Sequence, residues 1–101
     1  MEKMNNQLLN AISLWSGWKK EMHPIRSDAK VIKHYGQNKA NELLSQIHLL
    51  EDDYYSSDAR LIADDLAEMS NISIEHFRQK HPHLDAEIGQ IFSWCYTYDY
   101  K

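Results

Sequence analysis

Apolar residues recur at intervals of three and four positions along most of the chain, the spacing that places them on one face of an α-helix. Glycine and proline, which interrupt helices, occur only three times and twice in 101 residues. This composition is typical neither of disordered chains nor of turn-rich β-folds. We therefore expect an all-α protein, with residues 1–101 forming a single compact domain of five or six short helices.

The first predicted helix covers residues 2–22. Seven apolar residues recur through it at helical spacing: Met4, Leu8, Ala11, Ile12, Trp15, Trp18 and Met22. Gly17 weakens its middle, and Pro24 is expected to end it because proline disfavours helix at the residue before it. The two tryptophans lie one turn apart and are expected to pack in the core, as are Phe92 and Trp94 near the C-terminus.

Two further helices are expected before residue 52. Ser27 is a suitable N-cap for a short second helix, and Gly36 is a suitable stop after it, since glycine adopts the left-handed conformation that ends many helices. The third helix is expected over residues 39–51. Its inward face is predicted to consist of Ala40, Leu43, Leu44, Ile47 and Leu50.

A fourth helix is predicted from Ser56 or Ser57, either of which suits an N-cap, to Met69. Its buried stripe is expected to consist of Ala59, Ile62, Ala63, Leu66 and Met69. Successive residues rotate by about 100° around a helix, so a group of carboxylates falls beside this stripe. The predicted acidic edge comprises Asp58, Asp64, Asp65 and Glu68.

The C-terminal third is expected to form two helices and an aromatic C-terminal segment. A short fifth helix is predicted from a capping Ser73 to Lys80, before Pro82. A sixth is predicted from near Leu84 to about Thr97, with inward residues Ile88, Ile91, Phe92 and Cys95. Aromatic residues at the end of the chain alternate at period two: Phe92, Trp94, Tyr96, Tyr98 and Tyr100. We expect helix followed by an extended end packed on the domain; a β-strand is the alternative, disfavoured because it has no evident partner.

Charge is unevenly distributed along the chain. Residues 51–68 carry seven carboxylates and one arginine, a net charge of −6 in a chain whose total is −4. Residues 19–39 have the opposite balance, with six Lys or Arg and two acids. Tyr54 and Tyr55 lie beside the acidic residues, in the predicted connection between two helices. Tyrosine is enriched in protein interfaces, so this region predicts a surface that binds a basic partner.

The segment from Asp53 to Arg60, Asp-Tyr-Tyr-Ser-Ser-Asp-Ala-Arg, resembles the tyrosine-pair segment of the immunity proteins that neutralise nuclease colicins. Ser56 stands where those proteins have proline after the pair. The resemblance covers eight residues and extends to the broader class of helical immunity proteins of contact-dependent toxins. It implies an inhibitor that occludes a basic toxin domain without chemistry. The partner-binding residues it implies are Asp52, Asp53, Tyr54, Tyr55, Asp58, Asp64, Asp65 and Glu68.

Residues 66–78 allow a second interpretation. They are similar to the first helix-turn-helix of the arabinose-regulator family of transcription activators, where a Leu-Ala pair, an aliphatic-Ser pair and an aromatic residue recur at this spacing. The resemblance implies a turn near Asn71, with Ser73 capping a recognition helix anchored by Phe77. The alternative function is therefore a small DNA-binding regulator using residues 61–81. The family's glycine in the turn is replaced by Asn71, and nearby carboxylates would repel DNA phosphates.

No motif predicts catalysis, a cofactor or a metal site, so we expect a protein that is not an enzyme. Cys95 falls in an apolar helix, where burial should raise the pKa of its thiol and suppress the reactive thiolate. The histidines of His81-Pro82-His83 are too rigidly spaced to converge on a metal ion, and no zinc-binding motif accompanies them.

The chain is expected to be a cytoplasmic protein without a membrane partner. Its single cysteine gives no intrachain disulfide, and its N-terminal residues lack the pattern of a signal peptide. No apolar run is long enough to span a membrane. A pI near 5.8 disfavours non-specific nucleic-acid binding, which requires a positive face. The sequence leaves the oligomeric state open.

Overall fold

The computed structural model describes the backbone of residues 2–101 and the side chains of residues 6–101. Across these residues the chain forms helices joined by turns and loops, without a strand, so the all-α prediction is confirmed. The elements are α1 (Glu2–Ser16), α2 (Asp28–Tyr35), α3 (Gln37–Tyr55), α4 (Ala59–Ile62), α5 (Leu66–Lys80) and α6 (Ala86–Tyr100). No helix in this part of the chain combines the length and apolar character needed to cross a membrane.

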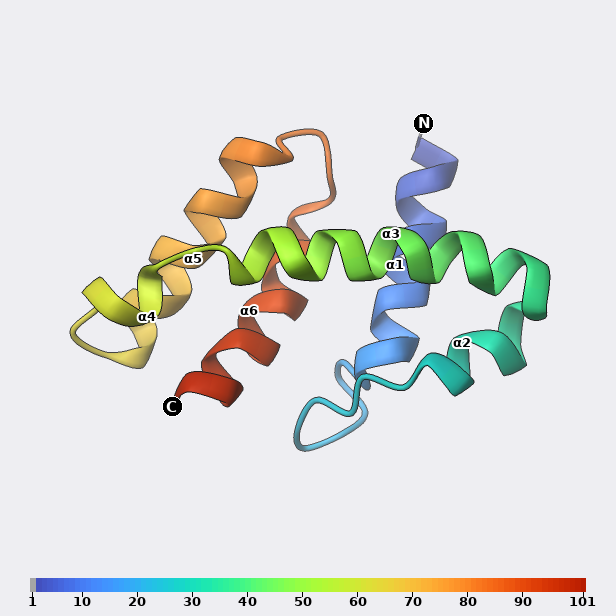
Figure 1. The fold of residues 1–101 in the computed structure, drawn as a ribbon, viewed down its shortest axis with the longest axis horizontal. Helices are drawn as coiled ribbons and strands as arrows, with labels where there is room; N and C mark the ends of the chain where they lie inside the picture. The colour runs from blue at the N-terminus through green and yellow to red at the C-terminus, as the bar shows by residue number, and fades with distance from the viewer. Residues whose placement is uncertain (1) are drawn as a thin grey trace.

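The helices pack around α3, which at 19 residues is the longest. Figure 1 shows α3 lying along the long axis of a molecule that measures 42 × 29 × 19 Å, across α1 and α6. α5 packs against α6 and α3, and α2 packs against α3 and α1. Figure 1 also shows that the single-turn α4 and the short α2 lie towards opposite ends of the long axis.

The core is formed by apolar faces that the sequence pattern identifies well. All five residues predicted to face inward from the third helix are buried, as are the four predicted for the sixth. Trp15 and Phe92, predicted to be core residues, are 1% and 0% exposed. Trp18 and Trp94 are only partly buried and contact each other, with ring centroids 5.4 Å apart. Periodicity therefore located the core correctly where a helix was placed correctly.

α1 ends at Ser16, six residues earlier than predicted, and the cause is Gly17 rather than Pro24. Gly17 has a φ of 82°, and the chain folds back so that the amide of Ile25 donates to the carbonyl of Ser16 at 3.0 Å. Met22, placed on the apolar stripe by the longer helix, is instead 97% exposed. Met4 lies outside the residues whose side chains are described.

The bounds predicted for α2 are confirmed, although Ser27 makes no side-chain capping hydrogen bond, whereas α3 is longer than predicted at both ends. Ser27 precedes α2 and Gly36, with a φ of 82°, separates α2 from α3. α3 starts immediately afterwards, at Gln37, and continues past the predicted end at residue 51 to Tyr55. The tyrosine pair consequently lies in the last turn of α3 and not in a connecting loop. Helical geometry turns Tyr54 onto the same inward face as Leu50 and Ile47.

The predicted fourth helix is interrupted after its first turn. Ala63 is extended, and Asp65 is the N-cap of a new helix, accepting a hydrogen bond from the amide of Glu68 at 2.7 Å. Aspartate followed three residues later by glutamate is a capping signal, which competes here with continuation of the helix. The predicted stripe is therefore wrong in part: Ala59 and Met69 are buried, but Ile62 and Leu66 are 55% and 45% exposed.

The predicted boundary between the fourth and fifth helices does not exist. α5 runs without interruption from Leu66 to Lys80, so the turn expected near Asn71 is absent and Ser73 is an internal residue. Ser73 is fully buried, and its hydroxyl lies 2.7 Å from that of Tyr54. The separate recognition helix that a helix-turn-helix requires is therefore not formed within residues 66–78.

α6 extends to Tyr100, so neither the extended end nor the strand alternative is correct. The alternating aromatic pattern contains a second spacing, since Phe92, Tyr96 and Tyr100 are four residues apart and share one helical face. The ring centroids of Tyr96 and Tyr100 are 4.9 Å apart. Tyr98, on another face, is 39% exposed.

The interruption before α5 gives a prediction about stability. Replacing Asp65 with alanine should lower the free energy of unfolding by about 1 kcal/mol, because the amide of Glu68 loses its cap. Asp64→Ala removes the same charge one position earlier, from an exposed bend that caps no helix. This substitution should change the free energy of unfolding by less than about 0.5 kcal/mol. Urea denaturation of both variants measures the difference, and equal losses would contradict the cap.

Candidate partner-binding surface

Tyr54, the first of the two predicted interface tyrosines, is a core residue. It is 1% exposed, and its ring centroid lies 5.2 Å from that of Phe77 and 5.9 Å from that of Phe92. Burial raises the pKa of its hydroxyl to about 12, in spite of the hydrogen bond with Ser73. Tyr54 therefore has no surface to offer a partner in this conformation.

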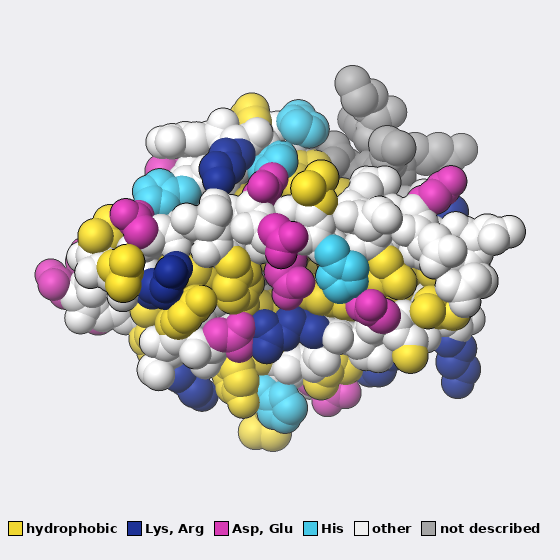
Figure 2. Space-filling model, viewed as in Figure 1, with side chains coloured by type: hydrophobic (Ala, Val, Ile, Leu, Met, Phe, Trp, Pro, Cys, Tyr) yellow, Lys and Arg dark blue, Asp and Glu magenta, His cyan; other side chains and the backbone are white. Residues whose placement is uncertain are grey.

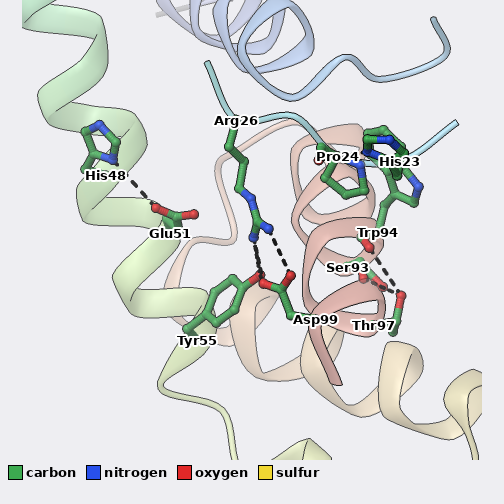
Figure 3. A network of polar contacts seen from close by, with 10 residues as sticks. All are labelled: His23, Pro24, Arg26, His48, Glu51, Tyr55, Ser93, Trp94, Thr97 and Asp99. Atoms are coloured by element: carbon green, nitrogen blue, oxygen red, sulfur yellow. Dashed lines mark hydrogen bonds and ion pairs between the residues drawn. The ribbon is translucent and has the colours of Figure 1, made fainter. Parts of the chain in front are cut away.

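Tyr55 is partly buried and joins three distant parts of the chain. Its hydroxyl donates to Oδ2 of Asp99 at 2.6 Å and accepts from Nη1 of Arg26 at 3.1 Å. Arg26 also binds Asp99 in bidentate fashion, at 2.6 and 2.9 Å, as Figure 3 shows. Arg26, which has an unusual φ of 48°, comes from the loop after α1, and Asp99 comes from the last turn of α6.

In this Arg26–Tyr55–Asp99 cluster, the positive charge of Arg26 and the hydroxyl of Tyr55 both stabilise the ionised carboxylate of Asp99. The hydrogen bonds from Arg26 are the main cause of a pKa for Asp99 below its usual value, and the bond from Tyr55 acts in the same direction. Burial is the main cause of a raised pKa for Tyr55, reinforced by its bond to Asp99. The cluster fastens the loop after α1 and the end of α6 to α3, which is a structural role.

Asp52 and Asp53, also predicted to bind a partner, lie in the last turn of α3, before the turn that leads to α4. Asp53 is partly buried, with Oδ2 2.9 Å from Nε2 of His81. Asp52 is exposed. Among the side chains described, no group of three or more His, Cys, Asp or Glu is arranged to hold a metal ion.

The remaining acidic residues surround an exposed apolar surface that the sequence analysis missed. Leu61 and Ile62 of α4 are 74% and 55% exposed, and Leu66 at the start of α5 is 45% exposed. Figure 2 shows hydrophobic side chains bordered by acidic ones at the left end of the molecule, over α4. We call this surface the α4 patch, and it consists of Asp58, Leu61, Ile62, Asp64, Asp65, Leu66 and Glu68.

The α4 patch is held in place by buried polar contacts. The hydroxyl of Tyr96 donates to the carbonyl of Ser57 at 2.9 Å and accepts from the amide of Arg60 at 3.0 Å. The hydroxyl of Ser57 accepts from the amide of Ala59 and lies 2.7 Å from Nδ1 of His76. These contacts attach α4 to both α5 and α6, although α4 itself is a single turn.

Arg60, the basic residue of α4, lies beside the α4 patch and contacts other parts of the chain. Arg60 donates from Nη1 to the carbonyl of Ser57 at 2.8 Å, and its guanidinium carbon lies 5.0 Å from the ring centroid of Tyr100. The exposed carboxylates of Asp58, Asp64 and Asp65 therefore dominate the charge around the apolar side chains. The sequence signal for this arrangement was the capping pair Asp65 and Glu68, which separates α4 from α5.

Cys95 is a free cysteine. It is fully buried in α6, and burial raises the pKa of its thiol to about 12, as its apolar surroundings predicted.

Comparison with known proteins identifies no relative: no protein-family model, no curated protein and no solved structure matches this chain significantly.

Proposed function

We propose that this protein binds a basic partner protein through the α4 patch and inhibits it by occlusion, as an immunity protein neutralises a nuclease-type toxin. The observation that carries the proposal is the grouping of three exposed large apolar side chains, Leu61, Ile62 and Leu66, within a border of carboxylates. An exposed apolar group with a polar rim is a feature of protein–protein interaction sites.

The two kinds of side chain would contribute differently to binding. Desolvation of Leu61, Ile62 and Leu66 in the centre of the interface would supply affinity and slow dissociation. Carboxylates such as Asp58 and Asp64 would attract a basic surface and speed association. Because Tyr96 and Ser57 hold α4 in place, little conformational freedom would be lost on binding. The mechanism involves no chemical step.

The first experiment is to purify the tagged protein from its native host and identify a protein that co-purifies at equal stoichiometry. The affinity of that partner is then measured for the double variant Leu61→Ala/Ile62→Ala. We expect affinity to fall about tenfold or more, equal to at least roughly 1.4 kcal/mol. Alanine preserves the helical turn, so the loss reports removal of the apolar contacts. Leu49→Ala is the matched control, because Leu49 is 62% exposed on α3 and outside the patch.

Charge reversal tests the role of the acids separately. Asp58→Lys and Asp64→Lys should mainly reduce the association rate and its dependence on salt, whereas Asp52→Lys outside the α4 patch should have a smaller effect. A partner that is acidic, or affinity unchanged by both patch variants, would refute the proposal. Tight binding to duplex DNA that disappears with charge reversal at Arg78 and Lys80 would favour the DNA-binding alternative instead.

A further inference from the structure

A groove with a volume of about 660 Å³ lies between the C-terminal half of α1, the turn that follows it, and α2. This volume is within the range of about 300–1,000 Å³ typical of small-molecule sites. Its lining combines the apolar side chain of Leu14 and the indole of Trp18 with Lys20, Lys30 and Lys33. The groove is distinct from the α4 patch, since α2 and α4 lie towards opposite ends of the molecule (Figure 1).

The groove carries a net positive charge. Three lysines and His34 line it, against one carboxylate, Glu21. Glu21 lies 3.9 Å from the amine of Lys30, at the outer limit of an ion pair. Among the side chains described, no carboxylate lies within ion-pair distance of Lys20 or Lys33. Two lysines are therefore available to an anion in the groove.

The indole of Trp18 is fixed in position before any ligand binds. The indole nitrogen of Trp18 donates to Oε2 of Glu87 at 2.8 Å, and the ring packs against Trp94. The turn beside it depends on Gly17, whose φ is 82° and where a Cβ would lie 2.6 Å from Cγ of Glu21. The indole of Trp18 therefore binds an apolar ligand without the entropic cost of ordering that side chain.

We propose that the groove between α1 and α2 binds a small organic anion that has an apolar body, such as a single-chain alkyl phosphate or carboxylate. The apolar body lies against Leu14 and Trp18, and the anionic group is paired with Lys20 and Lys33. An inorganic anion alone leaves the apolar lining in water, and an uncharged apolar molecule leaves the lysines without an ionic partner. The site therefore selects the combination of the two properties.

Isothermal titration calorimetry with decyl phosphate, kept below its critical micelle concentration, tests the proposal. We expect saturable 1:1 binding, with a change in tryptophan fluorescence from Trp18. Decyl phosphocholine, which has the same chain and no net charge, and inorganic phosphate, which has no chain, should each bind at least tenfold more weakly. Equal binding of either compound overturns the proposal, as does the absence of decyl phosphate binding.

Variants then locate the site. Lys20→Gln/Lys33→Gln should weaken decyl phosphate binding roughly tenfold or more, since the anionic group loses both of its ionic partners. Lys39→Gln/Lys101→Gln changes the net charge equally outside the groove and should leave the affinity within about twofold. All four lysines are at the surface, and thermal denaturation verifies that both variants fold. Equal weakening by the two double variants overturns the proposal, and so does binding to phosphatidylglycerol vesicles without binding to monomeric decyl phosphate.

Discussion

Replacing Tyr54 with alanine should lower the free energy of unfolding by about 3–5 kcal/mol, the usual effect of truncating a buried aromatic residue. The ring is 1% exposed and contacts Phe77, Phe92 and Tyr96, so its removal opens a cavity where α3, α5 and α6 meet. A domain of this size has a total stability of about 5–15 kcal/mol, so the loss is a large part of the whole. Chemical denaturation followed by circular dichroism measures it.

Two further variants separate packing from hydrogen bonding at this position. Tyr54→Phe keeps the ring and should lower stability by only about 1 kcal/mol, since Ser73 retains its own hydrogen bond to the carbonyl of Ser70. Tyr98→Ala removes a tyrosine that is 39% exposed on α6 and should have a similarly small effect. If Tyr54→Ala were as mild as Tyr98→Ala, Tyr54 would be a surface residue, as the sequence alone had indicated.

Replacing Asp99 with asparagine should lower the free energy of unfolding by about 2 kcal/mol at neutral pH. Hydrogen bonds to a charged group are worth roughly 1.5–3 kcal/mol, and Asp99 accepts bonds from both Arg26 and Tyr55. The amide keeps the shape of the carboxylate, so the change is one of charge and of acceptor capacity. Asp52→Asn, at an exposed position on α3, is the control and should have little effect.

The effect of Asp99→Asn should depend on pH. The pKa of Asp99 is lower in the folded protein than its ordinary value of 3.8, so the folded state favours the ionised carboxylate. Its stabilising contribution is therefore complete above about pH 5 and is lost as pH falls through the lowered pKa. The difference in stability between the native protein and Asp99→Asn should shrink in acid. A difference that is unchanged between pH 7 and pH 3 would contradict the Arg26–Tyr55–Asp99 cluster.

Comparison with the variant is needed because another carboxyl group titrates in the opposite sense. Burial is the main cause of a raised pKa for Glu51, so protonation of Glu51 in acid favours the folded state. The free energy of unfolding of the native protein, measured against pH, contains the contributions of both Asp99 and Glu51. Subtracting the profile of Asp99→Asn removes the part due to Glu51.

The candidate surface was only partly accessible to sequence reasoning. The acidic charge of residues 51–68 was visible, and Asp58, Asp64, Asp65 and Glu68 do lie together around α4. The tyrosines were misplaced because α3 continues one turn beyond the predicted end. The apolar centre of the α4 patch was missed because Ile62 and Leu66 fit the pattern of a buried stripe. Only the interruption at Ala63 and Asp65 turns them to the surface.

The sequence by itself determined that the chain is helical and which faces of α3 and α6 are buried. These properties depend on the spacing of apolar residues within a few turns, and the break at Gly36 depends on the backbone of a single residue. Tertiary structure decided the roles of the residues at the edges of those faces. Tyr55 meets Asp99 across 44 positions and Arg26 across 29, distances over which no local pattern extends. Whether a side chain at the edge of a helical face is buried depends on which other helix packs over it, and the pairing of helices is a property of the whole chain.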